Sequence, residues 1–139
     1  MSTSKESADT LIERIETYFD CADRCDVAGT LATMAPDCVL EYLTENERYE
    51  GRDAGIRGYF EARAKKVRQS WHGDFTHAAD PVRGIVATRF AVRRTDAGLA
   101  ERLGDNINLF QFEGRLIKRI SVWKSPGIRA TGAPSTGSR

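Results

Sequence analysis

The 139-residue sequence has no long apolar run and no excess of charge of one sign. Its 21 lysines and arginines nearly balance 20 aspartates and glutamates, whereas a dedicated nucleic-acid-binding domain shows a clear basic excess. No stretch approaches the roughly 20 apolar residues of a transmembrane helix, and residues 1–10 lack the basic-then-apolar order of a signal peptide. We therefore expect a cytoplasmic protein that binds neither nucleic acid nor a membrane.

Cysteine and histidine are also scarce. The three cysteines (Cys21, Cys25 and Cys38) are an odd number without a Cys-x-x-Cys pair, which argues against a disulfide framework and against a zinc site. The two histidines, His72 and His77, lack the spacing of a metal-ligand set. The sequence predicts no metal and no cofactor.

What is present is the composition of one soluble domain, with 40% hydrophobic and 29% charged residues. A chain of this size has room for one core and one pocket. We expect a single domain over residues 1–124. Residues 125–139 are rich in Gly, Pro, Ser and Thr, which predicts a flexible C-terminal tail.

Three helices are predicted in the first half of the chain. Apolar residues at three- and four-residue spacing predict an amphipathic helix over residues 9–24, with Ser7 or Asp9 as its cap. A shorter helix is predicted over residues 27–34, ended by Pro36. The third helix opens near Gly51, and its inner face comprises Ile56, Tyr59, Phe60, Ala64 and Val67. Its last residues include four cations, which we interpret as a solvated helix end: Arg63, Lys65, Lys66 and Arg68.

The remaining segments predict strands. Residues 38–43 favour β structure, and residues 44–50 form a loop or a tight ribbon. After the third helix the pattern changes to a period of two, which predicts strands over 71–77, 85–93, 99–112 and 116–123. The expected fold is α+β, with three helices packed in the concave face of a strongly curved, mainly antiparallel sheet and a pocket at one opening of the cone.

Two segments resemble a known superfamily. Residues 26–37 (DVAGTLATMAPD) are similar to the second helix of the SnoaL-like branch of the nuclear-transport-factor-2-like superfamily. Residues 107–117 (INLFQFEGRLI) are similar to its "D-x-F-R-F-x-G-K-I" hairpin. The resemblance covers roughly residues 9–124 and implies the α+β cone that ketosteroid isomerase and scytalone dehydratase share. That cone serves isomerases, dehydratases, cyclases, hydrolases and binding proteins, so each site residue needs its own argument.

Several family site patterns do not fit. Tyr42 and Asn108 stand where ketosteroid isomerase has carboxylic acids, and polyketide cyclases of the family place their aspartate at the Asn108 position. Arg89 fits the arginine of limonene-epoxide hydrolases, but Ala91 and Ser121 occupy the acid positions.

The scytalone-dehydratase-like pattern fits better. The resemblance places Asp23, Tyr42, His72 and Asn108 at the four positions that group uses, although Ala22 replaces a second tyrosine. Asp23 would hold His72, which would remove a proton next to a substrate carbonyl. Tyr42 and Asn108 would donate hydrogen bonds to the enolate oxygen, each worth about 3 kcal/mol. The chain would then be a cofactor-independent lyase or isomerase, dehydratase- or cyclase-like, acting on a small apolar or cyclic carbonyl compound.

Each of these residues also has a structural interpretation. Asp23 could cap the second helix, His72 could be a half-buried strand histidine, and Tyr42 could be a core aromatic with a bonded hydroxyl. Asn108 is assigned to the pocket, because two asparagines two apart disfavour a strand and share one face. His77 is expected to be exposed. The alternative function is therefore a non-catalytic ligand-binding or assembly protein of the same fold.

Further residues complete the expected site and surface. Substrate-binding positions are expected at Tyr18, Asn106, Phe110, Arg119 and Trp123. Arg119 would meet an anionic group if its face is concave, or form a surface ion pair if it is not. A homodimer through the convex face of the sheet is expected, since Leu116, Ile120 and Val122 would otherwise be exposed.

Overall fold

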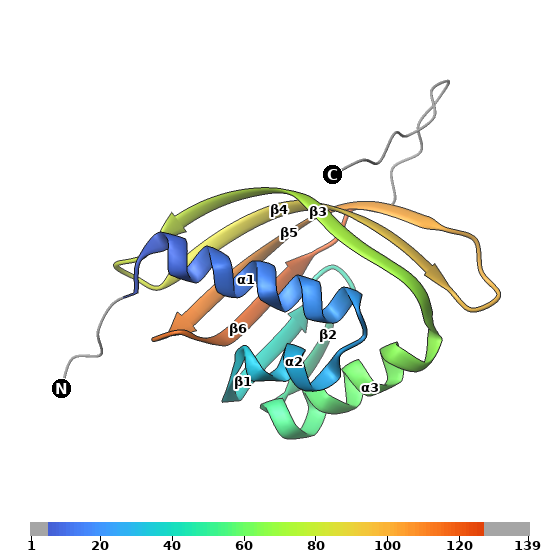
Figure 1. Cartoon of the computed structure of the whole chain (residues 1–139), viewed down its shortest axis with the longest axis horizontal. Coiled ribbons are helices and arrows are strands. Elements are labelled where there is room, and N and C mark those ends of the chain that lie inside the picture. The colour runs from blue at the N-terminus through green and yellow to red at the C-terminus, as the bar shows by residue number, and fades with distance from the viewer. Residues whose placement is uncertain (1–5, 127–139) are drawn as a thin grey trace.

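The computed structural model describes residues 6–126, which form four helical segments and six strands (Figure 1). The elements, in chain order, are α1 (Ala8–Asp23), α2 (Val27–Ala32), β1 (Met34–Tyr42), β2 (Glu47–Glu50), the π-helical segment η1 (Gly51–Ile56), α3 (Arg57–Lys66), β3 (Val67–Asp80), β4 (Ile85–Asp96), β5 (Arg102–Glu113) and β6 (Leu116–Trp123). The predicted tail lies outside the described residues apart from its first two, of which Ser125 accepts a hydrogen bond from the backbone N–H of Asp105 at 2.9 Å.

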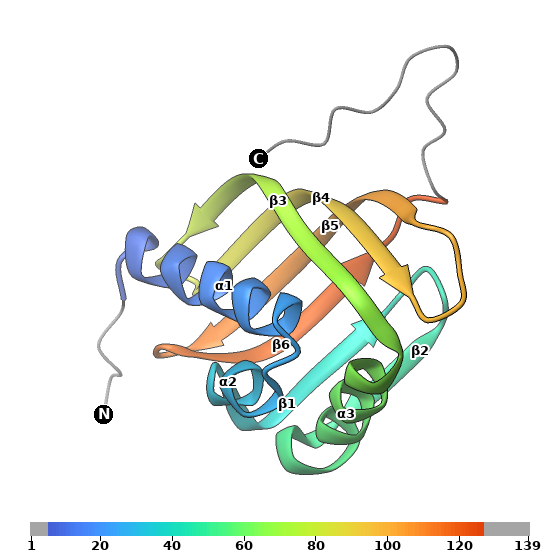
Figure 2. The same ribbon diagram turned by 45° about the vertical axis from the view of Figure 1, so that its right-hand side comes forward.

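The six strands form one sheet in the order β2-β1-β6-β5-β4-β3. All neighbouring strands are antiparallel except β1 and β6, which are parallel. The long strands β3 and β4 arch around α1, and α2 and α3 lie below it along the same side of the sheet (Figures 1 and 2). The predicted α+β cone is therefore confirmed.

Side-chain caps begin the first two helices, at Ser7, one of the two expected caps of the first helix, and at Asp26, which precedes the second. The hydroxyl of Ser7 accepts from the N–H of Thr10, and the carboxylate of Asp26 accepts from the N–H of Gly29. The predicted end of the second helix at Pro36 is wrong. The helix ends at Ala32, and Met34 already pairs with Ile117 of β6, so that Pro36 lies inside β1 at a register shift.

The other boundaries differ mainly at strand ends. Residues 44–50 form the predicted ribbon, because β2 pairs with β1 in an antiparallel register. The third helix opens as the π-helical segment η1 before becoming α-helical at Arg57. Strand β3 begins at Val67, four residues before the predicted start, and ends at Asp80. Its early start takes Val67 out of the helix and into the sheet.

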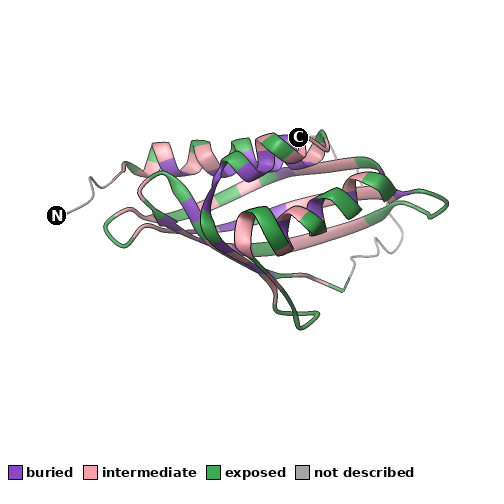
Figure 3. Ribbon diagram, turned by 90° about the horizontal axis from the view of Figure 1, so that it is seen from below, coloured by how far each residue is buried: buried purple, intermediate pink, exposed green. Residues whose placement is uncertain are grey.

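The core lies between the helices and the concave face of the sheet (Figure 3). The expectation that Ile120 and Val122 are exposed on the convex face is wrong, because both are buried in this core. The cause is a bulge: the β5–β6 pairing shifts between Gln111 and Phe112, which reverses the alternation of β6. Leu116, before the bulge, is exposed as expected. The homodimer stays a prediction. Besides Leu116, the convex side exposes Ile107 and Trp123, which are a cross-strand pair.

Within the described part of the chain, no helix has the length and apolar character needed to cross a bilayer.

Candidate functional site

Asp23 is the last residue of α1, and its carboxylate is held by β3. Ser70 donates its hydroxyl to Oδ1 at 2.7 Å, and the backbone N–H of His72 donates to Oδ2 at 2.9 Å. Nδ1 of the His72 ring lies 2.5 Å from Oδ1. Burial raises the pKa of Asp23, but the hydrogen bonds and the charge of His72, with the bond from Ser70, outweigh burial and lower it. The carboxylate is therefore ionised at neutral pH.

These contacts distinguish between the two interpretations of Asp23. The residue that caps α2 is Asp26, not Asp23. Asp23 instead joins α1 to β3, with a side chain only 8% exposed. Because an ionised carboxylate can only accept, the neutral imidazole of His72 must carry its proton on Nδ1.

The ring of His72 is fixed by aromatic neighbours. It packs against Phe19 of α1 at 4.9 Å between ring centroids and against Phe90 of β4 at 5.5 Å. Its side chain is 14% exposed, and it lines a cavity of about 900 Å³ between the helices and the sheet. His77, expected to be exposed, is instead bonded to Thr88 through Nδ1 and to Glu16 through Nε2.

The cavity includes most of the predicted site residues. Tyr18, Tyr42, Asn106 and Asn108 line it together with His72, and the rest of the wall comes mainly from α1, α3 and the inner face of β4, β5 and β6. Three expected substrate-binding residues do not line it, namely Phe110, Arg119 and Trp123.

The structure gives each of these three a different position. Phe110 is fully buried in the core, with its ring edge-on to Tyr18 at 5.8 Å. Arg119 forms a bidentate ion pair with Glu41 on the convex side, the surface pairing that the sequence left open. Trp123 is 43% exposed, because the bulge in β6 turns odd-numbered residues after it away from the core.

Tyr42 does not act alone at the wall of the cavity. Its hydroxyl donates to that of Tyr59 on α3 at 2.8 Å. Burial, followed by the neighbouring tyrosines Tyr59 and Tyr18, raises the pKa of Tyr42 well above the ordinary value. Since Tyr59 accepts the proton of Tyr42, its own hydroxyl proton is the one that the pair can offer to a ligand. The sequence placed Tyr59 only on the inner face of a helix.

Asn108 is 2% exposed and lies on β5 at the cavity wall. Within residues 6–126 its Oδ1 atom is one of two buried side-chain atoms without a hydrogen-bond partner. A buried amide oxygen without a partner carries a desolvation cost of about 1–3 kcal/mol that a ligand in the cavity could remove.

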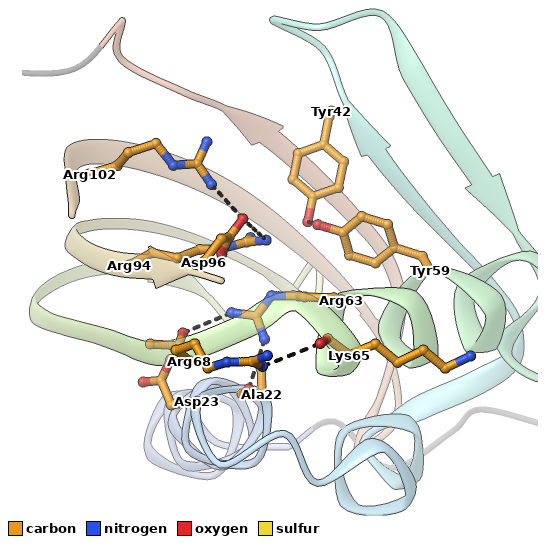
Figure 4. A network of polar contacts seen from close by, with 11 residues as sticks. Ala22, Asp23, Tyr42, Tyr59, Arg63, Lys65, Arg68, Arg94, Asp96 and Arg102 are labelled. Atoms are coloured by element: carbon orange, nitrogen blue, oxygen red, sulfur yellow. Dashed lines mark hydrogen bonds and ion pairs between the residues drawn. The ribbon is translucent and has the colours of Figure 1, made fainter. Parts of the chain in front are cut away.

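The basic end of the third helix is not wholly solvated, contrary to the expectation. Arg63 is 6% exposed, lines the cavity, and donates to the carbonyl of Ala22 at 2.9 Å and to Ser70 at 2.8 Å (Figure 4). It lies one helical turn after Tyr59 and one before Val67, so the apolar stripe that includes these positions was the signal that could have placed it inside. Arg94 of β4 lines the cavity as well.

No group of three or more His, Cys, Asp or Glu side chains able to hold a metal ion occurs in residues 6–126. The residues that meet at the cavity are instead suited to exchanging protons and donating hydrogen bonds.

The described fold has many relatives among solved structures. A Bacillus subtilis protein provisionally named an isomerase is 17% identical, with a TM-score of 0.76 over 85% of this chain and 88% of that one. A provisionally named polyketide cyclase from Xanthomonas campestris is 18% identical, with a TM-score of 0.70 over 83% and 90%. A Catenulispora acidiphila protein, described as having a ketosteroid isomerase-like fold and solved with trimethylamine, is 11% identical, with a TM-score of 0.73 over 82% and 86%.

This chain has the nuclear-transport-factor-2-like fold. No protein-family model and no curated protein matches the sequence. At these identities the likeness establishes the nuclear-transport-factor-2-like fold, whereas the activity must be argued from the cavity.

Proposed function

We propose that the chain is a lyase or isomerase that moves a proton next to a carbonyl group of a small molecule bound in the cavity. The observation that carries this proposal is the Asp23–His72 pair at the cavity wall, with 2.5 Å between Oδ1 and Nδ1. A carboxylate at Nδ1 orients the imidazole and stabilises the imidazolium that forms when Nε2 takes a proton.

The reaction begins with transfer of a proton from the carbon beside the carbonyl to Nε2 of His72, which leaves an enolate. Hydrogen bonds from Tyr59 and from the Asn108 amide would stabilise the enolate oxygen. If the next carbon carries a hydroxyl group, the same proton passes to that hydroxyl, water leaves, and a double bond forms. If it does not, the proton returns to another carbon and the product is an isomer. Neither course consumes a cofactor.

The names of two solved neighbours agree with this chemistry, since they describe an isomerase and a polyketide cyclase. The alternative, a non-catalytic ligand carrier, predicts a histidine that is exposed or bonded to the backbone. The bond between the His72 ring and a buried carboxylate favours the enzyme.

The test is proton exchange in deuterated water, followed by proton NMR, for small cyclic ketones such as β-tetralone. General-base catalysis is typically worth 10²–10⁴-fold, so His72→Gln should slow exchange by at least about 100-fold. His77→Gln is the matched control, because His77 is bonded to Thr88 and Glu16 and does not line the cavity. Exchange in His72→Gln at the wild-type rate would contradict the proposal.

A further inference from the structure

The cavity contains a buried positive charge without a carboxylate beside it. Arg63 is 6% exposed, and no carboxylate oxygen in residues 6–126 lies within 4.0 Å of its guanidinium nitrogens. Its two hydrogen bonds in the described part of the chain go to the carbonyl of Ala22 and the hydroxyl of Ser70. Buried charges are normally paired, so this arrangement leaves the guanidinium able to take an anion in direct contact.

The hydrogen-bonding capacity of Arg63 supports the same conclusion. A guanidinium has five N–H donors in a planar fork, and the two bonds to Ala22 and Ser70 use only two of them. The carboxylate of Asp23 accepts from the same Ser70 hydroxyl, so its negative charge lies behind Ser70 and one hydrogen bond away from the guanidinium.

A second guanidinium lines the cavity nearby. Arg94 donates through Nε to Asp96 at 2.7 Å, and the same carboxylate also accepts from Arg102 at 3.2 Å. One carboxylate therefore serves two arginines, both of which line the cavity. Figure 4 shows the Arg63 guanidinium between the Arg94–Asp96 pair and Ala22, with the Tyr42–Tyr59 pair beside it.

Each of the other charged residues of the cavity wall has a partner of opposite charge, which for Glu101 is a residue outside the wall. Lys124 lies 2.6 Å from Glu45, and Glu101 lies 3.5 Å from Arg93. These pairs cancel in charge. Arg63, Arg94 and Arg102 carry three positive charges against the carboxylates of Asp96 and, behind Ser70, of Asp23, so the net charge at this part of the wall is positive.

We propose that the cavity binds a small cyclic molecule bearing a carboxylate, which Arg63 holds, with Arg94 beside it. The planar fork of a guanidinium matches the two oxygens of a carboxylate, and the aromatic wall accommodates the ring. The unpartnered Oδ1 of Asn108 accepts from a hydroxyl group of the same molecule. The inference refines the proposed function, because the Asp23–His72 pair would act on this molecule, but its test requires no turnover.

The probes are naphthalene carboxylate and naphthalene carboxamide, which share a ring system and differ in charge. Calorimetric titration gives the ratio of the two dissociation constants for the full chain. We expect the carboxylate to bind at least tenfold more tightly. Arg63→Gln and Arg94→Gln should each reduce this preference to below threefold, and Arg63→Lys, which keeps the charge, should retain part of it.

Two controls make the result specific. Arg89→Gln removes an exposed arginine that pairs with Asp105 and does not line the cavity, so its preference should equal that of the wild type. Since Arg63 also joins α3 to α1 and β3, Arg63→Gln must retain the wild-type circular dichroism spectrum, and Arg94→Gln tests the same site without removing those bonds.

Equal affinity for both probes, no measurable binding of the carboxylate, or a preference that persists in both glutamine variants would overturn the inference. His72→Gln separates it from the proposed function, because this variant should lose proton exchange and keep the carboxylate preference. A preference without exchange in the wild type would sustain the anion site and refute the enzyme. Proton exchange in a wild type that shows no preference for the carboxylate would support the enzyme and refute the anion site.

Discussion

The carboxylate of Asp23 contacts His72 twice, at the ring through Nδ1 (2.5 Å) and at the backbone through the N–H group (2.9 Å). The two contacts fix both the position of the ring and the strand that carries it. They also tie the end of α1 to β3, which makes the catalytic proposal and the stability of the fold depend on one side chain. The predictions below use this dependence.

Replacement of Asp23 by Asn should destabilise the protein by about 1–3 kcal/mol, the cost of a buried donor left without an acceptor. In the native site both oxygens accept, from Ser70, from the backbone of His72 and from its ring. An amide places an NH₂ group against one of these donors. Urea denaturation measures the change, and Asp20→Asn, an exposed position on the same helix, is the control. An Asp23→Asn variant as stable as the wild type would contradict the hydrogen-bond assignment.

The tyrosine pair predicts unequal effects of two similar substitutions. Because Tyr42 donates to Tyr59, only Tyr59 has a hydroxyl proton left for a ligand. Tyr59→Phe should lower the rate of proton exchange by tenfold or more, in line with the loss of one oxyanion donor, and Tyr42→Phe should lower it less. Exchange rates for the two variants under identical conditions decide the matter, and a larger loss in Tyr42→Phe would reverse the assigned direction of the bond.

Stability should fall in acid through a small set of carboxylates. The hydrogen bond from Arg119 lowers the pKa of Glu41, and that from Arg94 lowers the pKa of Asp96. A lowered pKa in the fold adds stability above the unfolded value of about 4, and this stability is lost as the pH falls through the folded value. The urea midpoint should therefore decline as the pH is lowered from about 5 to about 2. Glu41→Gln should reduce the slope of the free energy of unfolding against pH by the equivalent of up to about one bound proton. The same slope in Glu41→Gln as in the wild type would show that Glu41 is not paired in solution.

The cysteines should differ in reactivity. Burial raises the pKa of Cys38 to about 12, and its side chain is inaccessible. Burial also raises the pKa of Cys21, whereas Cys25 is partly exposed. Iodoacetamide followed by mass spectrometry should modify Cys25 first, and Cys38 only after unfolding in urea. Modification of Cys38 in the native protein at the rate of Cys25 would contradict this packing of β1.

Much of the fold was predictable, because the spacing of apolar residues and the helix caps depend only on residues that are close together in the sequence. The apolar spacing of residues 9–24 and the cap at Ser7 place the first helix to within one residue at each end, and the start of the second helix at Val27 was also as expected. The boundaries that were wrong depend on distant partners. Met34 leaves the helix because β6 offers Ile117 as a neighbour, and no signal for that pairing lies near Met34 in the sequence.

The sequence anticipated part of the cavity wall. Asp23, His72 and Asn108 were singled out through a resemblance in order and spacing, and the structure brings all three to the wall of one cavity or beside it. Arg119 and Trp123 were misplaced because a single bulge reverses the alternation of β6. Arg63 was misjudged because charge at the end of a helix usually faces water, although its position on the apolar stripe of the helix pointed inward, where α1 and β3 cover it.

The central claim is that Nε2 of His72 is the general base. Its most direct test is the tautomer of the His72 ring, measured from the ring nitrogen chemical shifts of nitrogen-15-labelled protein at a pH high enough for the ring to be neutral. The account predicts the proton on Nδ1, toward Asp23, with Nε2 unprotonated and able to accept a proton from a ligand. His77, assigned with the His77→Gln variant, serves as the internal reference. A proton on Nε2 in the neutral ring would contradict the account, because the nitrogen proposed as the general base would then have no lone pair to offer.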